Sequence, residues 1–197
     1  MIRPNYIPPS LLSEGLYCTR RLWLRANNVE FFEEKLNLIH AKSLKEHVRE
    51  CGINDSGWRY EARLPSGSRL DAWIPDESLG IEFKSGHPHA THLYQVWALH
   101  QELLQLGVQD AEMQLWYQTR YGDEAKKLAG KWGLDHGQPD ENICAICTDT
   151  GDPDFMVKME RSAAILIGEM ENKKMPEPKE ITSEACRMCS FVDWCHS

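Results

Sequence analysis

The sequence has no long hydrophobic run and no excess of basic residues. No stretch approaches the roughly 18 consecutive apolar residues of a membrane-spanning helix. The opening MIRPNYIPPSLLSEG has no apolar segment behind a basic start, so no signal peptide is expected. The 22 Lys and Arg against 30 Asp and Glu give a net charge of −8, which argues against coating nucleic acid through a general basic surface. We expect a cytoplasmic protein without membrane contact, in which a local basic channel or a metal-mediated site could still meet nucleic acid.

The cysteine content is high and odd, at seven residues. In a reducing compartment this disfavours a disulfide framework, and metal or cluster ligation becomes the leading explanation. The C-terminal CRMCSFVDWC places Cys186, Cys189 and Cys195 in C-x2-C-x5-C spacing, one ligand short of a four-cysteine site. The candidates for the missing ligand are Cys18, Cys51, Cys144 and Cys147.

A zinc site offers an alternative use of the cysteines. Cys144-x2-Cys147 and Cys186-x2-Cys189 have the form of two zinc knuckles. The segment ICAIC also fits an apolar strand in which cysteine acts as a small hydrophobic residue, and we favour that interpretation.

Hydrophobic periodicity and turn residues predict an α/β (α+β) architecture with a small mixed sheet flanked by helices. Helices are expected over 10–26, 30–51, 89–107 and 154–174, with Gly52 and Gly107 ending the second and third. Three strands joined by turns are expected in 58–86, and further strands at 111–119 and 143–147. The polar stretch around 121–142 is assigned no element. With no internal repeat, a single domain over 1–197 is expected.

One predicted strand carries two charged residues on the same face. In LGIEFKSG the period-two alternation places Glu82 and Lys84 together, and burying two ions is costly unless something stabilises them. The preceding strand, RLDAWI, carries Asp71. Two carboxylates on neighbouring strands would repel, but a divalent cation between them offsets that repulsion and prefers oxygen ligands. We expect Mg²⁺ or Mn²⁺ at Asp71 and Glu82. Asp76, in the turn sequence IPDES, is the weaker candidate because a turn aspartate usually caps surface backbone.

An acid, a short hairpin and Glu-x-Lys on the next strand resemble the PD-(D/E)XK nuclease superfamily. The resemblance implies a restriction-endonuclease-like core and phosphodiester hydrolysis, with Asp71, Glu82 and Lys84 as catalytic residues. Lys84 would orient or deprotonate the attacking water and neutralise charge at phosphorus.

The RecB-like branch of that superfamily adds two helical motifs. A motif resembling G-x-x-x-H supplies a further metal ligand, and SLKEH matches it at His47 with serine in place of glycine; His40 is the competing candidate. A Q-x-x-x-Y motif follows the lysine strand, where Gln95 fits and Leu99 replaces the tyrosine. The resemblance implies that Gln95 contacts DNA or water.

An early cysteine followed by basic and aromatic residues, YCTRRLWL, together with the C-terminal C-x2-C-x5-C, resembles the CRISPR-associated RecB-like exonuclease family. The resemblance extends from Cys18 to Cys195. It implies a structural 4Fe-4S cluster that joins the segments 10–26 and 180–197. Its ligands would be Cys18, Cys186, Cys189 and Cys195.

The same resemblance implies a metal-dependent DNA exonuclease that acts on single-stranded ends. It would process prespacers in CRISPR adaptation together with the integrase complex. Two alternatives stay open: a phage or repair iron-sulfur nuclease acting on recombination ends, and a non-catalytic DNA-binding scaffold subunit. The presence of Asp71, Glu82 and Lys84 together argues against the scaffold.

Overall fold

The computed structural model describes residues 18–26, 44–147 and the helical residues 157, 158, 161, 164, 165 and 168. Its helices are α2 (Thr19–Ala26), an unlabelled helix over 44–50, α4 (Ala90–Gln105) and α5 (Gly122–Trp132), with short 3-10 helices η1 (Pro75–Glu77) and η2 (Thr119–Tyr121). Its strands are β1 (Arg59–Arg63), β2 (Arg69–Ile74), β3 (Leu79–Lys84), β4 (Glu112–Gln118), β5 (His136–Asp140) and β6 (Ile143–Cys147).

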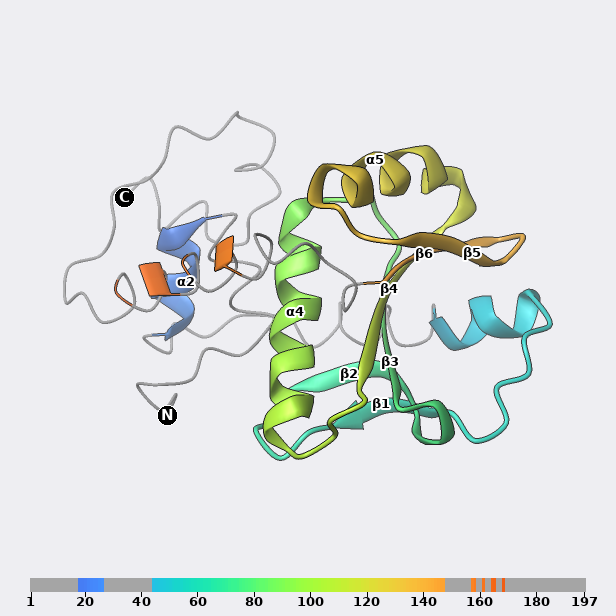
Figure 1. The fold of residues 1–197 in the computed structure, drawn as a ribbon, viewed down its shortest axis with the longest axis horizontal. Coiled ribbons are helices and arrows are strands. Elements are labelled where there is room, and N and C mark those ends of the chain that lie inside the picture. The colour runs from blue at the N-terminus through green and yellow to red at the C-terminus, as the bar shows by residue number, and fades with distance from the viewer. Residues whose placement is uncertain are drawn as a thin grey trace.

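The strands form one six-stranded mixed sheet in the order β1-β2-β3-β4-β6-β5 (Figure 1). Strands β1, β2 and β3 form an antiparallel meander, whereas β3 and β4 are parallel. Parallel neighbours need a crossover connection, and α4 supplies it. The charged strand β3 therefore lies inside the sheet, between β2 and β4.

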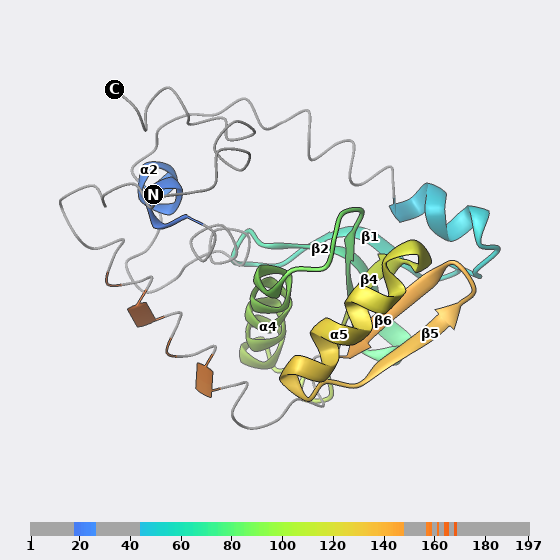
Figure 2. The same ribbon diagram turned by 90° about the horizontal axis from the view of Figure 1, so that it is seen from above.

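Helices cover both faces of this sheet. Helix α4 lies on one face, whereas the helix over 44–50 lies on the other (Figures 1 and 2). Helices α4 and α5 share a core with the sheet that includes Leu93, Ala129 and Leu115. The opposite core includes Val48 and Phe83. In the central strands β4 and β6 alternate residues therefore enter different cores, as the period of two requires.

The sequence located most of these elements correctly. The three strands of 58–86 are β1, β2 and β3, and the strands expected at 111–119 and 143–147 are β4 and β6. The helix expected over 89–107 is α4, followed by Gly107 at φ +88°. Gly52, at φ +67°, likewise follows the helix over 44–50. These glycines adopt the left-handed backbone that ends many helices.

The structure confirms a mixed sheet packed against helices, and it adds elements in the polar stretch at 121–142, to which the sequence assigned none. That stretch contains α5 and β5, and β5 extends the sheet to six strands. Helix α5 buries only the small side chains of Ala125 and Ala129, which leave a weak hydrophobic signal. Strand β5 is an edge strand with the sequence HGQPD and is mostly exposed, so its pairing with β6 rather than its composition defines it.

Three other expected helices are described only in part. The helix expected over 10–26 is seen as α2, and that over 30–51 as residues 44–50. The remainder of both, and most of 154–174, lie outside the described residues. No helix in the described part of the chain is long and apolar enough to cross a membrane.

Candidate active site

The hydrogen-bonded ladder between β2 and β3 ends next to Asp71 and Glu82. It pairs Ile74 with Leu79, Trp73 with Gly80 and Ala72 with Ile81, and no further pair follows although β3 continues to Lys84. Beyond this point the carboxylate of Asp71 accepts a hydrogen bond from the backbone amide of Phe83, with Oδ2 at 2.8 Å from the nitrogen. The Asp71 side chain thus satisfies an amide of the neighbouring strand, and the bond fixes the carboxylate against β3.

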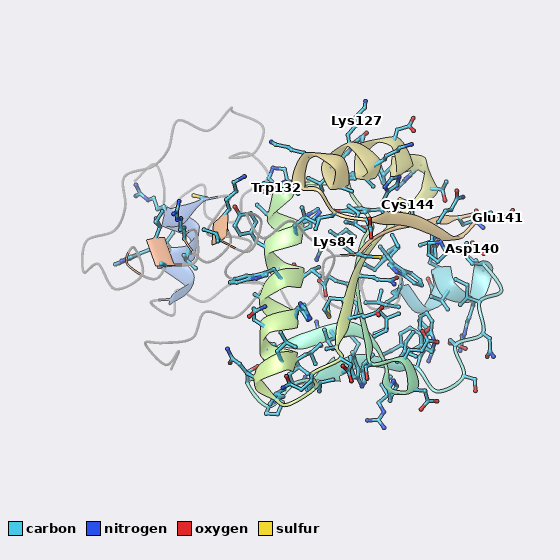
Figure 3. All side chains as sticks on the ribbon, in the orientation of Figure 1. Lys84, Lys127, Trp132, Asp140, Glu141 and Cys144 are labelled. Atoms are coloured by element: carbon cyan, nitrogen blue, oxygen red, sulfur yellow. The ribbon has the colours of Figure 1, made fainter. Side chains whose placement is uncertain are left out.

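Glu82, Lys84 and Gln95 form a closed hydrogen-bonded triangle. Lys84 Nζ lies 2.7 Å from Glu82 Oε1 and donates a second bond to Gln95 Oε1 at 3.0 Å. The amide nitrogen of Gln95 donates to the same Glu82 Oε1 at 2.5 Å. Gln95 comes from α4, and Lys84 lies in the layer between α4 and the sheet (Figure 3). The helix after the lysine strand therefore orients both charged groups.

The electrostatics of the triangle reflect burial. Glu82 is only 3% exposed, and this burial, followed by the charge of Asp71, raises the pKa of Glu82 to about 7. Burial alone would lower the pKa of Lys84, but the charges of Glu82 and Asp71 outweigh it and hold that pKa above its ordinary value. Lys84 is therefore an ammonium at neutral pH. In this arrangement it neutralises charge and donates hydrogen bonds, rather than accepting a proton.

One oxygen of Glu82 is left over. Both donors of the triangle contact Oε1, and Oε2 is buried without a hydrogen-bond partner among the described residues. A buried carboxylate oxygen normally has a donor or a cation. Oxygen from Glu82 and Asp71 is the donor type that Mg²⁺ and Mn²⁺ prefer, so the two residues fit a divalent cation by their chemistry. Within the described chain, however, no three His, Cys, Asp or Glu side chains converge closely enough to enclose a metal.

His47 lies apart from this triangle, on the helix over 44–50. Its ring contacts that of Phe83 with centroids 5.4 Å apart, and Phe83 belongs to the core of the opposite sheet face. The Nε2 atom of His47 is buried with no hydrogen-bond partner in the described part of the chain. The structure thus brings Asp71, Glu82, Lys84 and Gln95 together and places His47 beside the strand that carries two of them. His40 lies outside the described residues.

The alternatives to these residues occupy other environments. Asp76 is exposed in η1, in the turn between β2 and β3. Leu99, at the tyrosine position of the helical motif, is 1% exposed and packs in the core under α4. An apolar side chain at this position completes the packing of α4 and offers no hydroxyl to the site.

Three further residues, which the sequence did not indicate, border the site. His92 Nδ1 lies 2.9 Å from the hydroxyl oxygen of Tyr117, which is fully buried. Burial, followed by the charge of Lys84, lowers the pKa of His92 to about 3, so this imidazole is neutral. The signal for His92 was its position one helical turn before Gln95 on the same face. The third residue, Glu61 of β1, acts electrostatically on Glu82.

The expected iron-sulfur site is described at one ligand only. Cys18 is buried at the start of α2, whereas Cys186, Cys189 and Cys195 lie outside the described residues. Cys144 is buried in β6 with its sulfur 3.6 Å from the Tyr117 carbonyl oxygen. This placement in an apolar strand agrees with its interpretation as a small hydrophobic residue. The described cysteines, including Cys51 and Cys147, form no disulfide.

Comparison with known proteins leaves the site as the main guide to function. No protein-family model, curated protein or solved structure gives a significant match to this chain. The contacts among Asp71, Glu82, Lys84 and Gln95 are therefore the strongest indication of function.

Proposed function

We propose that this protein is a divalent-metal-dependent nuclease whose centre is formed by Asp71, Glu82, Lys84 and Gln95. The observation that carries the proposal is the buried Glu82 Oε2, which has no hydrogen-bond partner among the described residues and is accompanied by the charge of Asp71. An ammonium and an amide on the other oxygen leave this one available to a cation.

Each residue has a role that its contacts support. Asp71 and Glu82 would hold the cation, and the bond from the Phe83 amide fixes the Asp71 carboxylate for this task. A bound Mg²⁺ or Mn²⁺ polarises a phosphodiester and acidifies a coordinated water. Lys84, kept protonated by its acidic neighbours, offers positive charge to the phosphate as negative charge develops on it. Gln95 restrains both Lys84 and Glu82 through its amide.

The order of elements supports the narrower assignment to a restriction-endonuclease-like core. A helix with His47 precedes the meander, the acid and Glu-x-Lys lie on paired strands, and the helix with Gln95 follows. The resemblance to CRISPR-associated RecB-like exonucleases extends the proposal to single-stranded DNA ends, prespacer processing with the integrase complex, and a 4Fe-4S cluster at Cys18, Cys186, Cys189 and Cys195.

The test is an anaerobic assay with Mn²⁺ on single-stranded DNA labelled at either the 5′ or the 3′ end. Wild type should shorten the DNA from one end, and Glu82→Gln should abolish this because the amide cannot replace the carboxylate as a ligand. Glu77→Gln removes an exposed acid from η1 and is the matched control with full activity.

Two results would contradict the proposal. Degradation that survives in both Asp71→Asn and Glu82→Gln would indicate a contaminant or a different centre. A wild-type protein that binds DNA without cleaving it would favour a scaffold subunit.

A further inference from the structure

Three carboxylates lie in a row across β1, β2 and β3. The β1–β2 register pairs Tyr60 with Ala72 and Ala62 with Leu70, so Glu61 stands opposite Asp71. The β2–β3 ladder ends with Ala72 and Ile81, and beyond it Asp71 accepts a hydrogen bond from the Phe83 amide, which keeps the Asp71 carboxylate beside Glu82 on β3. Like charges directly opposite on neighbouring strands are destabilising, so this row needs an explanation beyond the fold.

The three carboxylates are close enough for their charges to interact. Burial, partly offset by Arg69, raises the pKa of Glu61, and the charge of Asp71 raises it further. The charges of Asp71 and Glu61 both contribute to the raised pKa of Glu82. The row is thus a single region of concentrated negative charge, and it contains the unpartnered Oε2 of Glu82.

Glu61 forms an ion pair with Arg69 of the neighbouring strand. Its Oε2 lies 2.6 Å from Arg69 Nε, and the side chains of Arg69 and Glu61 are 37% and 28% exposed. A partly exposed ion pair of this kind contributes little stability, so it can open at small cost. Glu61 also has a φ of 53°, an uncommon conformation for a residue with a side chain.

We infer that Glu61 is a third acidic ligand of the divalent cation held by Asp71 and Glu82, and that it leaves Arg69 to reach that cation. This inference rests on the proposed function. Arg69 then acts as a latch that neutralises Glu61 while no cation is bound. Among the described residues the three carboxylates do not converge on one point, and release of Glu61 from Arg69 would allow it to approach the other two.

The test measures Mn²⁺ binding to the full-length, anaerobically purified protein by the room-temperature electron paramagnetic resonance signal of free Mn²⁺. Glu61→Gln should weaken binding roughly tenfold or more, whereas Glu77→Gln should leave it unchanged. Arg69→Gln should strengthen binding a few-fold because Glu61 is already released. In the double variant Arg69→Gln with Glu61→Gln, this gain in Mn²⁺ affinity should disappear. A general effect of removing the positive charge of Arg69 would persist without Glu61. Circular dichroism in EDTA checks that each variant is folded.

The outcomes distinguish this inference from the proposed function. If Glu82→Gln loses Mn²⁺ but Glu61→Gln binds it as wild type does, the role of Glu61 is overturned and the nuclease proposal stands. If Arg69→Gln binds no more tightly than wild type, the latch is overturned. If wild type itself binds no Mn²⁺, both the inference and the proposed function fail.

Discussion

The two faces of strand β3 differ sharply although they share one backbone. Ile81 and Phe83 enter a largely apolar core beneath the helix over 44–50, where Phe83 also contacts the ring of His47. Glu82 and Lys84, the alternate residues, form a buried polar triangle beneath α4. One face therefore stabilises the fold by excluding water, and the other retains charges where burial disfavours them.

This contrast distinguishes residues that stabilise the fold by packing from residues whose burial has to be explained in another way. An apolar pair in place of Glu82 and Lys84 would suit a buried strand better, since well-packed hydrophobic residues often replace buried ion pairs without loss of stability. Under the proposed function, the polar face has a different task, which is cation and phosphate binding. The following predictions test this division, beginning with the largest effect.

The apolar face should show the largest loss of stability. Phe83 is 4% exposed and contacts the ring of His47. Phe83→Ala should lower the free energy of unfolding by about 3–5 kcal/mol because it leaves a cavity, as measured by urea denaturation. Phe83→Leu is the control and should lose less, since it fills more of the space. A Phe83→Ala protein as stable as wild type would show that this face is not a packed core.

The polar face should show its largest effect in catalysis. Lys84→Met should reduce nuclease activity about 100-fold to 1000-fold, the range seen when one group that stabilises transition-state charge is removed. Lys127→Met is the matched control on the exposed outer side of α5 (Figure 3) and should keep wild-type activity. Rates should be measured on protein shown by circular dichroism to be folded. Equal rates in Lys84→Met and wild type would end the assignment of Lys84 to catalysis.

The polar face should also make the stability of the protein fall as the pH rises. The pKa of Glu82 rises from 4.5 to about 7 on folding, chiefly through burial, so ionisation of Glu82 opposes folding. Its cost is absent below pH 4.5 and complete above pH 7. In EDTA, Glu82→Gln should therefore be more stable than wild type by about 3 kcal/mol at pH 8, with the difference vanishing near pH 4.5. Thermal unfolding across this pH range measures it, and a difference independent of pH would contradict it.

Much of this division could be predicted from the sequence, because alternation along a strand is a local signal. The pattern in LGIEFKSG was sufficient to place Glu82 and Lys84 on one face and Phe83 on the other. The helix bearing Gln95 was also evident from its periodicity and from Gly107. The choice of Gln95 itself came from a family resemblance, since nothing in its local sequence distinguishes it.

Other parts of the site depend on register and distance, which composition does not encode. Glu61 faces Asp71 only because the turn between β1 and β2 fixes their pairing. Tyr117 neighbours the site because β4 is parallel to β3 and pairs with it at Lys84. His92 contacts Tyr117 across α4 and β4. Long-range contacts of this kind become visible only in the folded chain.

The smallest predicted effect compares a hydroxyl on each face of the sheet. On the polar face, Tyr117 is fully buried and its hydroxyl contacts His92 Nδ1 at 2.9 Å, so Tyr117→Phe should cost about 1–2 kcal/mol by leaving that nitrogen unsatisfied. Tyr60, beside the apolar core, is half-buried and donates to Asp55 at 3.1 Å. Tyr60→Phe should cost about 0.5 kcal/mol because water can replace the lost bond.

Urea denaturation of both variants at neutral pH gives the two values side by side. Tyr117 is fully buried whereas Tyr60 is half-buried, so water can replace the lost bond more readily at Tyr60, and the loss at Tyr117 should exceed that at Tyr60. The His92→Leu change in the Tyr117→Phe background removes the unsatisfied nitrogen and should recover part of the lost stability. Equal losses at the two tyrosines, or no recovery in the double variant, would mean that the polar face is hydrated and that burial does not set the energies assigned to its charged groups.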